Sequence, residues 1–335
     1  MVHTPRIASL ISSATEILYL LGLDEQVVGV SHECDYPSQV ADKPRLTRSL
    51  VDATATSHAI DEQVRDLAGS QSALYAIDLE LLATLAPDLV ITQAQCDVCA
   101  VRYEDVVAAV RDTPTLGGAE ILALNPQSLN DVLDDVERIG RATGSLAAAN
   151  EARRSLAERV TRVRTVTDRM APSSRIRAIC LEWIDPPMVA CNWMSELVAM
   201  AGADPGLSHA GRHSVYSDWR AIVDYDPQVL VIMPCGFGLE RAIHEAQVLA
   251  GWPGWKSLAA VHENRVFAVD GNAYFNRSGP RLVDSLEILA HLFHPRHFRP
   301  PTSVGSGAWQ RLTTQARSLV PAHPAVDQPG ENRDA

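Results

Sequence analysis

Residues 78–92 read DLELLATLAPDLVIT, and this stretch decides the fold. Its apolar residues first recur at helical spacing, then Pro87 stops the helix, and a short apolar run follows that is typical of a buried strand. Residues 219–233 read WRAIVDYDPQVLVIM and repeat this order around Pro227. We interpret the two stretches as equivalent parts of two related α/β lobes.

Further segments extend this pattern in both directions. Apolar runs at 6–10, 27–30, 176–181 and 265–269 predict additional strands, and residues 145–170 contain no Gly or Pro, which predicts a long helix. We therefore expect two Rossmann-like lobes joined by a long backbone helix, with a ligand cleft between them. The expected boundaries are an N-terminal lobe at 1–125, a helical connector at 126–171, a C-terminal lobe at 172–300 and a flexible tail at 301–335.

The charge of the chain limits its partners. The 335 residues include 41 acidic and 29 basic side chains, a formal net charge of −12. A field of this sign repels phosphate backbones and anionic lipids, so neither nucleic acid nor a membrane surface is an expected partner. No apolar run approaches the ~18 residues of a membrane span, and the first residues do not resemble a secretory signal. These features predict a cytoplasmic protein whose partner is a small molecule or a metal chelate.

Four of the six cysteines directly follow predicted strands. In open α/β sheets the ligand lies beyond the carboxyl ends of the strands, so these thiols are expected to face one crevice. A set of four thiolates suits an iron–sulfur cluster or zinc, although a redox pair or small buried core residues remain alternatives. The four candidate metal ligands are Cys34, Cys96, Cys99 and Cys235; Cys180 is expected in the core, and Cys191 is a possible fifth thiol.

Aromatic, amide and basic side chains follow the same strand ends. A pocket with aromatic walls and a few polar groups suits a flat small molecule with a polar rim. The residues expected to contact the ligand are His32, Tyr36, Gln93, Trp183, Asn192, Trp193, Phe237, Asn272, Tyr274 and Arg277. If the protein is an enzyme, the candidate acid–base groups are Glu182, His32 and Asp35.

Several segments together resemble the cobalamin-binding periplasmic proteins, a family of metal-chelate receptors with a helical backbone between two lobes. The segments that carry the resemblance lie at 6–10, 13–16, 28–31, 35–37, 79–91 and 275–282. The resemblance implies a corrinoid ligand and docking to a membrane permease through one surface Glu on each lobe. Glu80 matches the first of these positions, but the second falls near Arg220, so docking to that permease is not expected. The cysteines and the N-terminus instead suggest a cytoplasmic branch of the family.

Two classes of function follow from these observations. In the first, the protein binds a corrinoid, another metal chelate or a Cys-ligated metal between its lobes. In the second, it is an enzyme whose iron–sulfur cluster is held by Cys34, Cys96, Cys99 and Cys235 and acts on a small molecule. A zinc-stabilised interaction domain is a third alternative.

Overall fold

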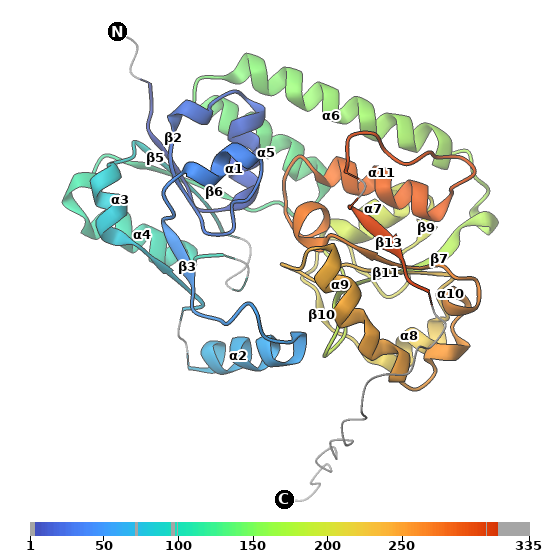
Figure 1. The fold of residues 1–335 in the computed structure, drawn as a ribbon. Helices are drawn as coiled ribbons and strands as arrows, with labels where there is room; N and C mark the ends of the chain where they lie inside the picture. The colour runs from blue at the N-terminus through green and yellow to red at the C-terminus, as the bar shows by residue number, and fades with distance from the viewer. Residues whose placement is uncertain (1–3, 71–72, 95–97, 99, 306, 314–335) are drawn as a thin grey trace, which may run out of the picture.

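The computed structural model describes residues 4–70, 73–94, 98, 100–305 and 307–313. Two α/β lobes lie side by side, and a long helix spans them along one edge (Figure 1). This confirms the predicted fold class. Among the helices in these ranges, none combines the length and apolarity that crossing a bilayer requires.

The N-terminal lobe is built on a four-stranded parallel sheet. Its strand order is β2-β1-β5-β6, comprising Val27–Val30, Ile7–Ser9, Leu89–Gln93 and Glu120–Leu124. A separate antiparallel ribbon pairs β3 with β4, which are Thr47–Ser49 and Tyr75–Ile77. The helices of this lobe are α1 (Ser12–Leu20), α2 (Ser57–Gly69), α3 (Leu79–Leu85) and α4 (Tyr103–Asp112).

The C-terminal lobe has a mixed sheet whose central strands β7, β11 and β12 are parallel. Those strands are Ile176–Trp183, Val229–Ile232 and Val266–Val269, and the shorter strands are β8 (Met188–Val189), β9 (Ala203–Asp204), β10 (Val215–Tyr216) and β13 (Trp309–Arg311). Its helices are α7 (Trp193–Met200), α8 (Trp219–Tyr225), α9 (Leu239–Glu245), α10 (Ala259–His262) and α11 (Leu282–Phe293). β13 pairs antiparallel with β12 and lies in the segment that was predicted to be a tail, so the sheet extends into that segment.

The helices α5 (Leu129–Ala142) and α6 (Leu146–Thr167) connect the lobes. The 22 residues of α6 give a rod of about 33 Å at about 1.5 Å per residue. Arg159 ties this rod to α11, because its guanidinium contacts Asp284 at 2.5 Å and Glu287 at 2.7 Å. The connector is therefore fixed to the C-terminal lobe by charge as well as by packing.

The stretches at 78–92 and 219–233 adopt the same structure in the two lobes. α3 begins after Asp78 and α8 after Asp218, and each aspartate accepts a hydrogen bond from a backbone N–H of the first turn. Ala86 and Asp226 then end the helices in the left-handed conformation, with φ of 41° and 49°. Positive φ is uncommon for non-glycine residues, so its occurrence at the same position in both lobes supports the predicted repeat.

Two arginines occupy matching places in this repeat. The side chain of Arg6, just before β1, donates to Leu85 O, and that of Arg177 in β7 donates to Tyr225 O. Each guanidinium thus satisfies a carbonyl at the end of its short helix, which would otherwise lack a partner.

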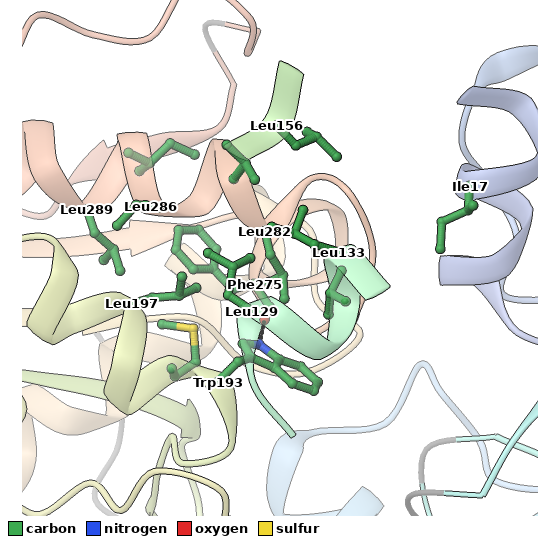
Figure 2. Close-up of a cluster of buried hydrophobic side chains, with 14 of the residues drawn as sticks. Ile17, Leu129, Leu133, Leu156, Trp193, Leu197, Phe275, Leu282, Leu286 and Leu289 are labelled. Atoms are coloured by element: carbon green, nitrogen blue, oxygen red, sulfur yellow. Dashed lines mark hydrogen bonds between the residues drawn. The ribbon is translucent and has the colours of Figure 1, made fainter. Parts of the chain in front are cut away.

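The largest hydrophobic core cluster runs through the connector into both lobes. It joins Ile17 of α1 with residues of α5, α6, α7 and α11. Figure 2 shows Leu129 and Leu133 of α5 beside Trp193 of α7 and Leu282 of α11. Because this cluster is shared, the relative position of the lobes is coupled to core packing.

Gly140 allows α5 and α6 to approach closely. A Cβ atom at this position would lie 2.3 Å from Ala149 Cβ. We expect Gly140→Ala to lower the free energy of unfolding by about 1–2 kcal/mol, because overpacking outweighs the higher helix propensity of alanine. Gly69→Ala is the matched control, since its added Cβ meets open space. Urea denaturation measures both variants, and equal stability of Gly140→Ala and wild type would contradict the close packing of the two helices.

Asp135 of α5 predicts a pH-dependent stability. Burial raises the pKa of this carboxyl to about 6 from its ordinary 3.8, although Arg138 opposes the shift. The folded state holds this proton more tightly than the unfolded state, so stability falls as the pH rises from about 4 to 6. Asp135→Asn should therefore be more stable than wild type by about 1–2 kcal/mol at pH 7, with the gain vanishing near pH 4. Thermal denaturation of both proteins between pH 4 and pH 7 tests whether the stability of wild type falls, relative to Asp135→Asn, as the pH rises.

Candidate ligand-binding site

Segments that follow strands of the two lobes meet between the lobes. Asp35 follows β2, and the Arg277 guanidinium donates to both of its carboxylate oxygens at 2.5 and 3.0 Å. Asn272, after β12, donates to Asp35 at 2.9 Å and accepts from Arg277 at 2.9 Å. Three residues predicted to contact the ligand or to act as acid or base therefore form one hydrogen-bonded set across the lobes.

A second ion pair lies directly behind this set. Arg281 donates to Glu16 of α1 at 2.9 and 2.6 Å, and Arg277 lies 3.7 Å from the same carboxylate. Burial raises the pKa of Glu16 even though Arg281 and Arg277 oppose it. For Asp35, burial also raises the pKa, but the hydrogen bonds and charge of Arg277 outweigh it and hold the pKa below its usual value. We call Glu16, Asp35, Arg277, Arg281 and Asn272 the inter-lobe charge cluster.

Sequence reasoning did not include Glu16 and Arg281 among the site residues. The available signal was an acidic residue within the apolar run of α1, where seven of nine helix residues are buried. A buried carboxylate requires a cationic or hydrogen-bonding partner, so an acidic residue in this helix was a signal for an ion pair, but the sequence does not indicate which residue is its partner.

An aromatic wall lies at the end of β7. The rings of Trp183 and Phe237 are 5.3 Å apart, and the Arg241 guanidinium stacks 3.6 Å from the centre of the Phe237 ring. Trp183 is half-buried, and its indole Nε1 is buried without a hydrogen-bond partner among the described residues. A buried donor of this kind is costly unless another molecule supplies an acceptor.

The other predicted contact residues of the N-terminal lobe differ in accessibility. Tyr36 is 47% exposed and the Arg281 guanidinium lies 4.1 Å from its ring centre, which leaves much of the phenol open to a ligand. His32 is half-buried, with Nδ1 2.7 Å from Thr47 Oγ1 and Nε2 3.2 Å from Glu33 Oε1. Gln93 is buried, and its Nε2 donates to the backbone carbonyl of Val101. His32 and Gln93 are thus held by protein groups.

In the C-terminal lobe, Trp193 lies in the hydrophobic core. Its ring is buried, and its indole N–H donates to Phe275 O at 3.0 Å. Tyr274 is half-buried and packs against the same core. Asn192 has a positive φ of 48° and a buried Oδ1 without a partner among the described residues. Trp193 therefore packs under the loop, whereas the Asn192 side-chain oxygen can still accept a hydrogen bond.

Glu182, a predicted acid–base candidate, is joined to its own lobe. Ser214 Oγ donates to its carboxylate at 2.6 Å, and its backbone carbonyl accepts from Cys235 N. Of the other two candidates, Asp35 pairs with Arg277 and His32 with Thr47.

The predicted cysteine cluster is not supported. Cys34 is buried in the core of the N-terminal lobe, where its sulfur lies 3.1 Å from Thr15 Oγ1. The turn after β2, in which Cys34 N donates to Ser31 O, directs the thiol inward, and burial raises its pKa to about 11. Cys34 is therefore not a ligand facing the other lobe, and placing it there was wrong.

The other cysteines that the structure describes are not grouped around a metal site. Cys180 is buried in β7, as expected, and Cys191 is buried with its sulfur accepting from His209 N, while Cys235 is half-buried. Cys96 and Cys99 lie outside the described residues. Among the residues that the structure describes, no three His, Cys, Asp or Glu side chains are grouped to hold a metal ion.

The sequence profile of the periplasmic binding protein family matches residues 7–273. The chain belongs to the periplasmic binding protein family. This confirms the family-level resemblance stated from the sequence. The uncharacterized ABC transporter substrate-binding lipoprotein of Bacillus subtilis is 25% identical over 298 residues, covering 88% of this chain and 81% of that protein.

Two further proteins are similar to this chain. The vitamin B12-binding protein of Vibrio cholerae is 24% identical over 286 residues, covering 84% of this chain and 86% of that protein. The periplasmic haem-binding protein RhuT of Roseiflexus sp. RS-1 superposes with a TM-score of 0.65 at 21% identity, covering 88% of this chain and 99% of that one. At this identity the structural likeness shows the fold alone.

Membership of this family overturns the predicted cytoplasmic location. The matching family is described as periplasmic binding proteins, and the similar proteins include a lipoprotein of an ABC transporter, so the comparisons point to an extracytoplasmic setting instead. The prediction relied on the first residues not resembling a secretory signal. A family match over most of the chain is stronger evidence than that absence.

Proposed function

We propose that this periplasmic binding protein delivers a corrinoid, or another tetrapyrrole metal chelate, to an ABC importer. A relative named for vitamin B12 aligns over 84% of the chain, which supports a corrinoid as the first ligand to test. The ligand would lie between the lobes, where segments after β2, β7, β11 and β12 come together. Within the described residues, an iron–sulfur cluster or a structural zinc ion has no support, because Cys34 is buried in one lobe and no three His, Cys, Asp or Glu side chains are grouped to hold a metal.

The chemistry of the aromatic wall carries the proposal. Trp183 offers a half-buried ring and an unsatisfied indole N–H, and the buried Phe237 ring packs behind it under the Arg241 guanidinium. A corrinoid presents a broad apolar face rimmed with amide side chains, so one molecule would meet both the ring and the N–H. Tyr36 offers a second, exposed aromatic surface on the opposite lobe.

The test is a titration of purified protein with cyanocobalamin and, separately, with hemin. Tryptophan fluorescence and isothermal titration calorimetry should show one site with a Kd at or below about 1 µM, which corresponds to about −8 kcal/mol. The compound that binds with the lower Kd identifies the class of tetrapyrrole. Absence of saturable binding by both compounds would contradict the proposal.

Docking to the permease of that importer is part of the same proposal, and it replaces the expectation from the sequence that such docking does not occur. α3 and α8 are equivalent helices on the two lobes. The first turn of α3 exposes Glu80 beside the half-exposed Leu79. The first turn of α8 exposes Arg220, whose side chain is 85% exposed. The opposite charges imply that the permease presents a basic group to α3 and an acidic group to α8.

Charge reversal tests this docking surface. In proteoliposomes that contain the permease and its ATPase, Glu80→Arg should reduce stimulation of ATP hydrolysis at least about tenfold while leaving ligand affinity unchanged. Glu25→Arg, on an exposed turn of the same lobe, is the matched control. Full stimulation by Glu80→Arg would show that the permease does not use this face.

A further inference from the structure

We propose that residues 51–69 form a flap that gates ligand entry to the space between the lobes; the identity of the ligand in this inference rests on the proposed function. The flap consists of a short loop followed by α2. Figure 1 shows α2 beyond the β3–β4 ribbon, next to the C-terminal lobe. The proposal depends on how this segment is attached to each lobe.

On its own lobe the flap is attached at a narrow base. β3 and β4 pair through Ser49 and Tyr75, and Leu50 N donates to Leu74 O at 2.9 Å immediately beyond that pair. Within the flap, Asp52 N donates to Gln63 Oε1 at 2.9 Å and holds the loop against α2. The two ends of the excursion are therefore joined at a two-stranded hinge, and the segment can move as one unit.

The flap lacks an apolar anchor. Ser57 and Asp61 are the buried residues of α2, and both are polar. The apolar residues Ile60, Val64 and Leu67 are half-buried, and they belong to none of the three hydrophobic core clusters of the described residues. Elements with few buried apolar contacts are the first to open by local fluctuation, so α2 is expected to open far more often than α5.

On the other lobe the flap is held by a polar clasp. Glu245 at the end of α9 accepts from Ser57 N at 3.1 Å and from Ser57 Oγ at 2.9 Å. Tyr216 of β10 donates to Asp61 at 2.6 Å. Arg241 of α9 donates to the backbone carbonyls of Ala53 and Ala55. Ser57 and Asp61 are thus buried by the clasp to the opposite lobe.

The clasp lies beside the proposed ligand surface. Arg241, which holds the loop of the flap, is the same side chain that stacks on Phe237 of the aromatic wall. A ligand that approaches this wall from the α2 side must therefore break the clasp or wait until it opens. Because the clasp joins two parts of the protein and not the protein to the ligand, weakening it should raise the rates of entry and exit together.

The experiment combines kinetics with hydrogen exchange on the full chain. Tyr216→Phe removes the hydrogen bond to Asp61, and Glu245→Met removes the two hydrogen bonds that Glu245 accepts from Ser57. Tyr225→Phe is the matched control, because Tyr225 donates to Asp204 O within its own lobe. Stopped-flow fluorescence with cyanocobalamin and with hemin gives the association and dissociation rates. Exchange of the α2 amides is followed by mass spectrometry, with α5 as the internal reference.

The flap predicts that both clasp variants accelerate α2 exchange and raise both rate constants by about three- to tenfold, with Kd changed less than twofold. The control should behave as wild type. Unchanged α2 exchange, or a raised Kd with an unaltered association rate, would overturn the flap. If neither compound binds, the proposed function fails and exchange alone decides: faster α2 exchange in the variants supports the flap, and unchanged exchange refutes it.

Discussion

Replacing Arg277 with Met should lower the free energy of unfolding by about 2–3 kcal/mol, because the buried Glu16 keeps only Arg281 as its cation and the half-exposed Asp35 loses its ion pair. Arg277 is only 8% exposed, and it donates to Asp35 and Asn272 while lying 3.7 Å from Glu16. Met fills a similar volume, so the loss comes from the carboxylates of Glu16 and Asp35, which stay close together without one of their cations.

Urea denaturation at pH 7 measures this loss. Arg220→Met is the control, because that side chain is 85% exposed and its ion pair with Asp224 spans 3.8 Å on the surface; it should change stability by less than about 0.5 kcal/mol. A double variant with Asp35→Asn should recover part of the loss, since one of the stranded charges is removed. Similar stability of Arg277→Met and wild type would show that the inter-lobe charge cluster does not hold the lobes together.

The second large effect concerns ligand affinity. Trp183→Ala should raise the Kd for the bound tetrapyrrole by about 30- to 100-fold, because it removes both the ring face and the indole donor. Trp183→Phe keeps a ring but no donor, so a rise of about three- to tenfold is expected. The difference in Kd between the two variants separates the contribution of ring stacking from that of the indole hydrogen bond.

Trp219→Phe is the control for both variants. Trp219 packs against Trp252 and donates to Pro253 O, in a cluster of the C-terminal lobe that does not include Trp183. Calorimetric titration of the three variants and wild type, with circular dichroism to confirm folding, gives the comparison. Equal affinity of Trp183→Ala and wild type would place the ligand elsewhere.

The repeated helix–Pro–strand pattern made the fold predictable. Around Pro87 and Pro227 the local sequence already determines the helix end and the buried strand that follows, because both depend on neighbouring residues. β13 was not predictable in this way. β13 pairs with β12 across 40 to 44 positions of sequence, and it lies in a segment of polar and Pro-containing composition.

The site was predicted less completely, because side-chain direction depends on tertiary contacts. Asp35, Asn272 and Arg277 were expected near the ligand and do come together, although as partners of one another. Cys34 follows a strand end in the sequence just as they do, yet a turn directs it to Thr15. Trp193 likewise follows a strand, and a hydrogen bond to Phe275 holds it in the core. Position after a strand thus identifies a neighbourhood and leaves the direction of each side chain open.

The most direct test of ligand binding between the lobes is a crystal structure of the protein with cyanocobalamin or hemin, whichever binds more tightly. We predict that the macrocycle lies between the lobes against Trp183, with an acceptor of the ligand at hydrogen-bond distance from the Trp183 indole nitrogen. A ligand bound on an outer face of either lobe, with Trp183 uncontacted, would contradict the proposed function.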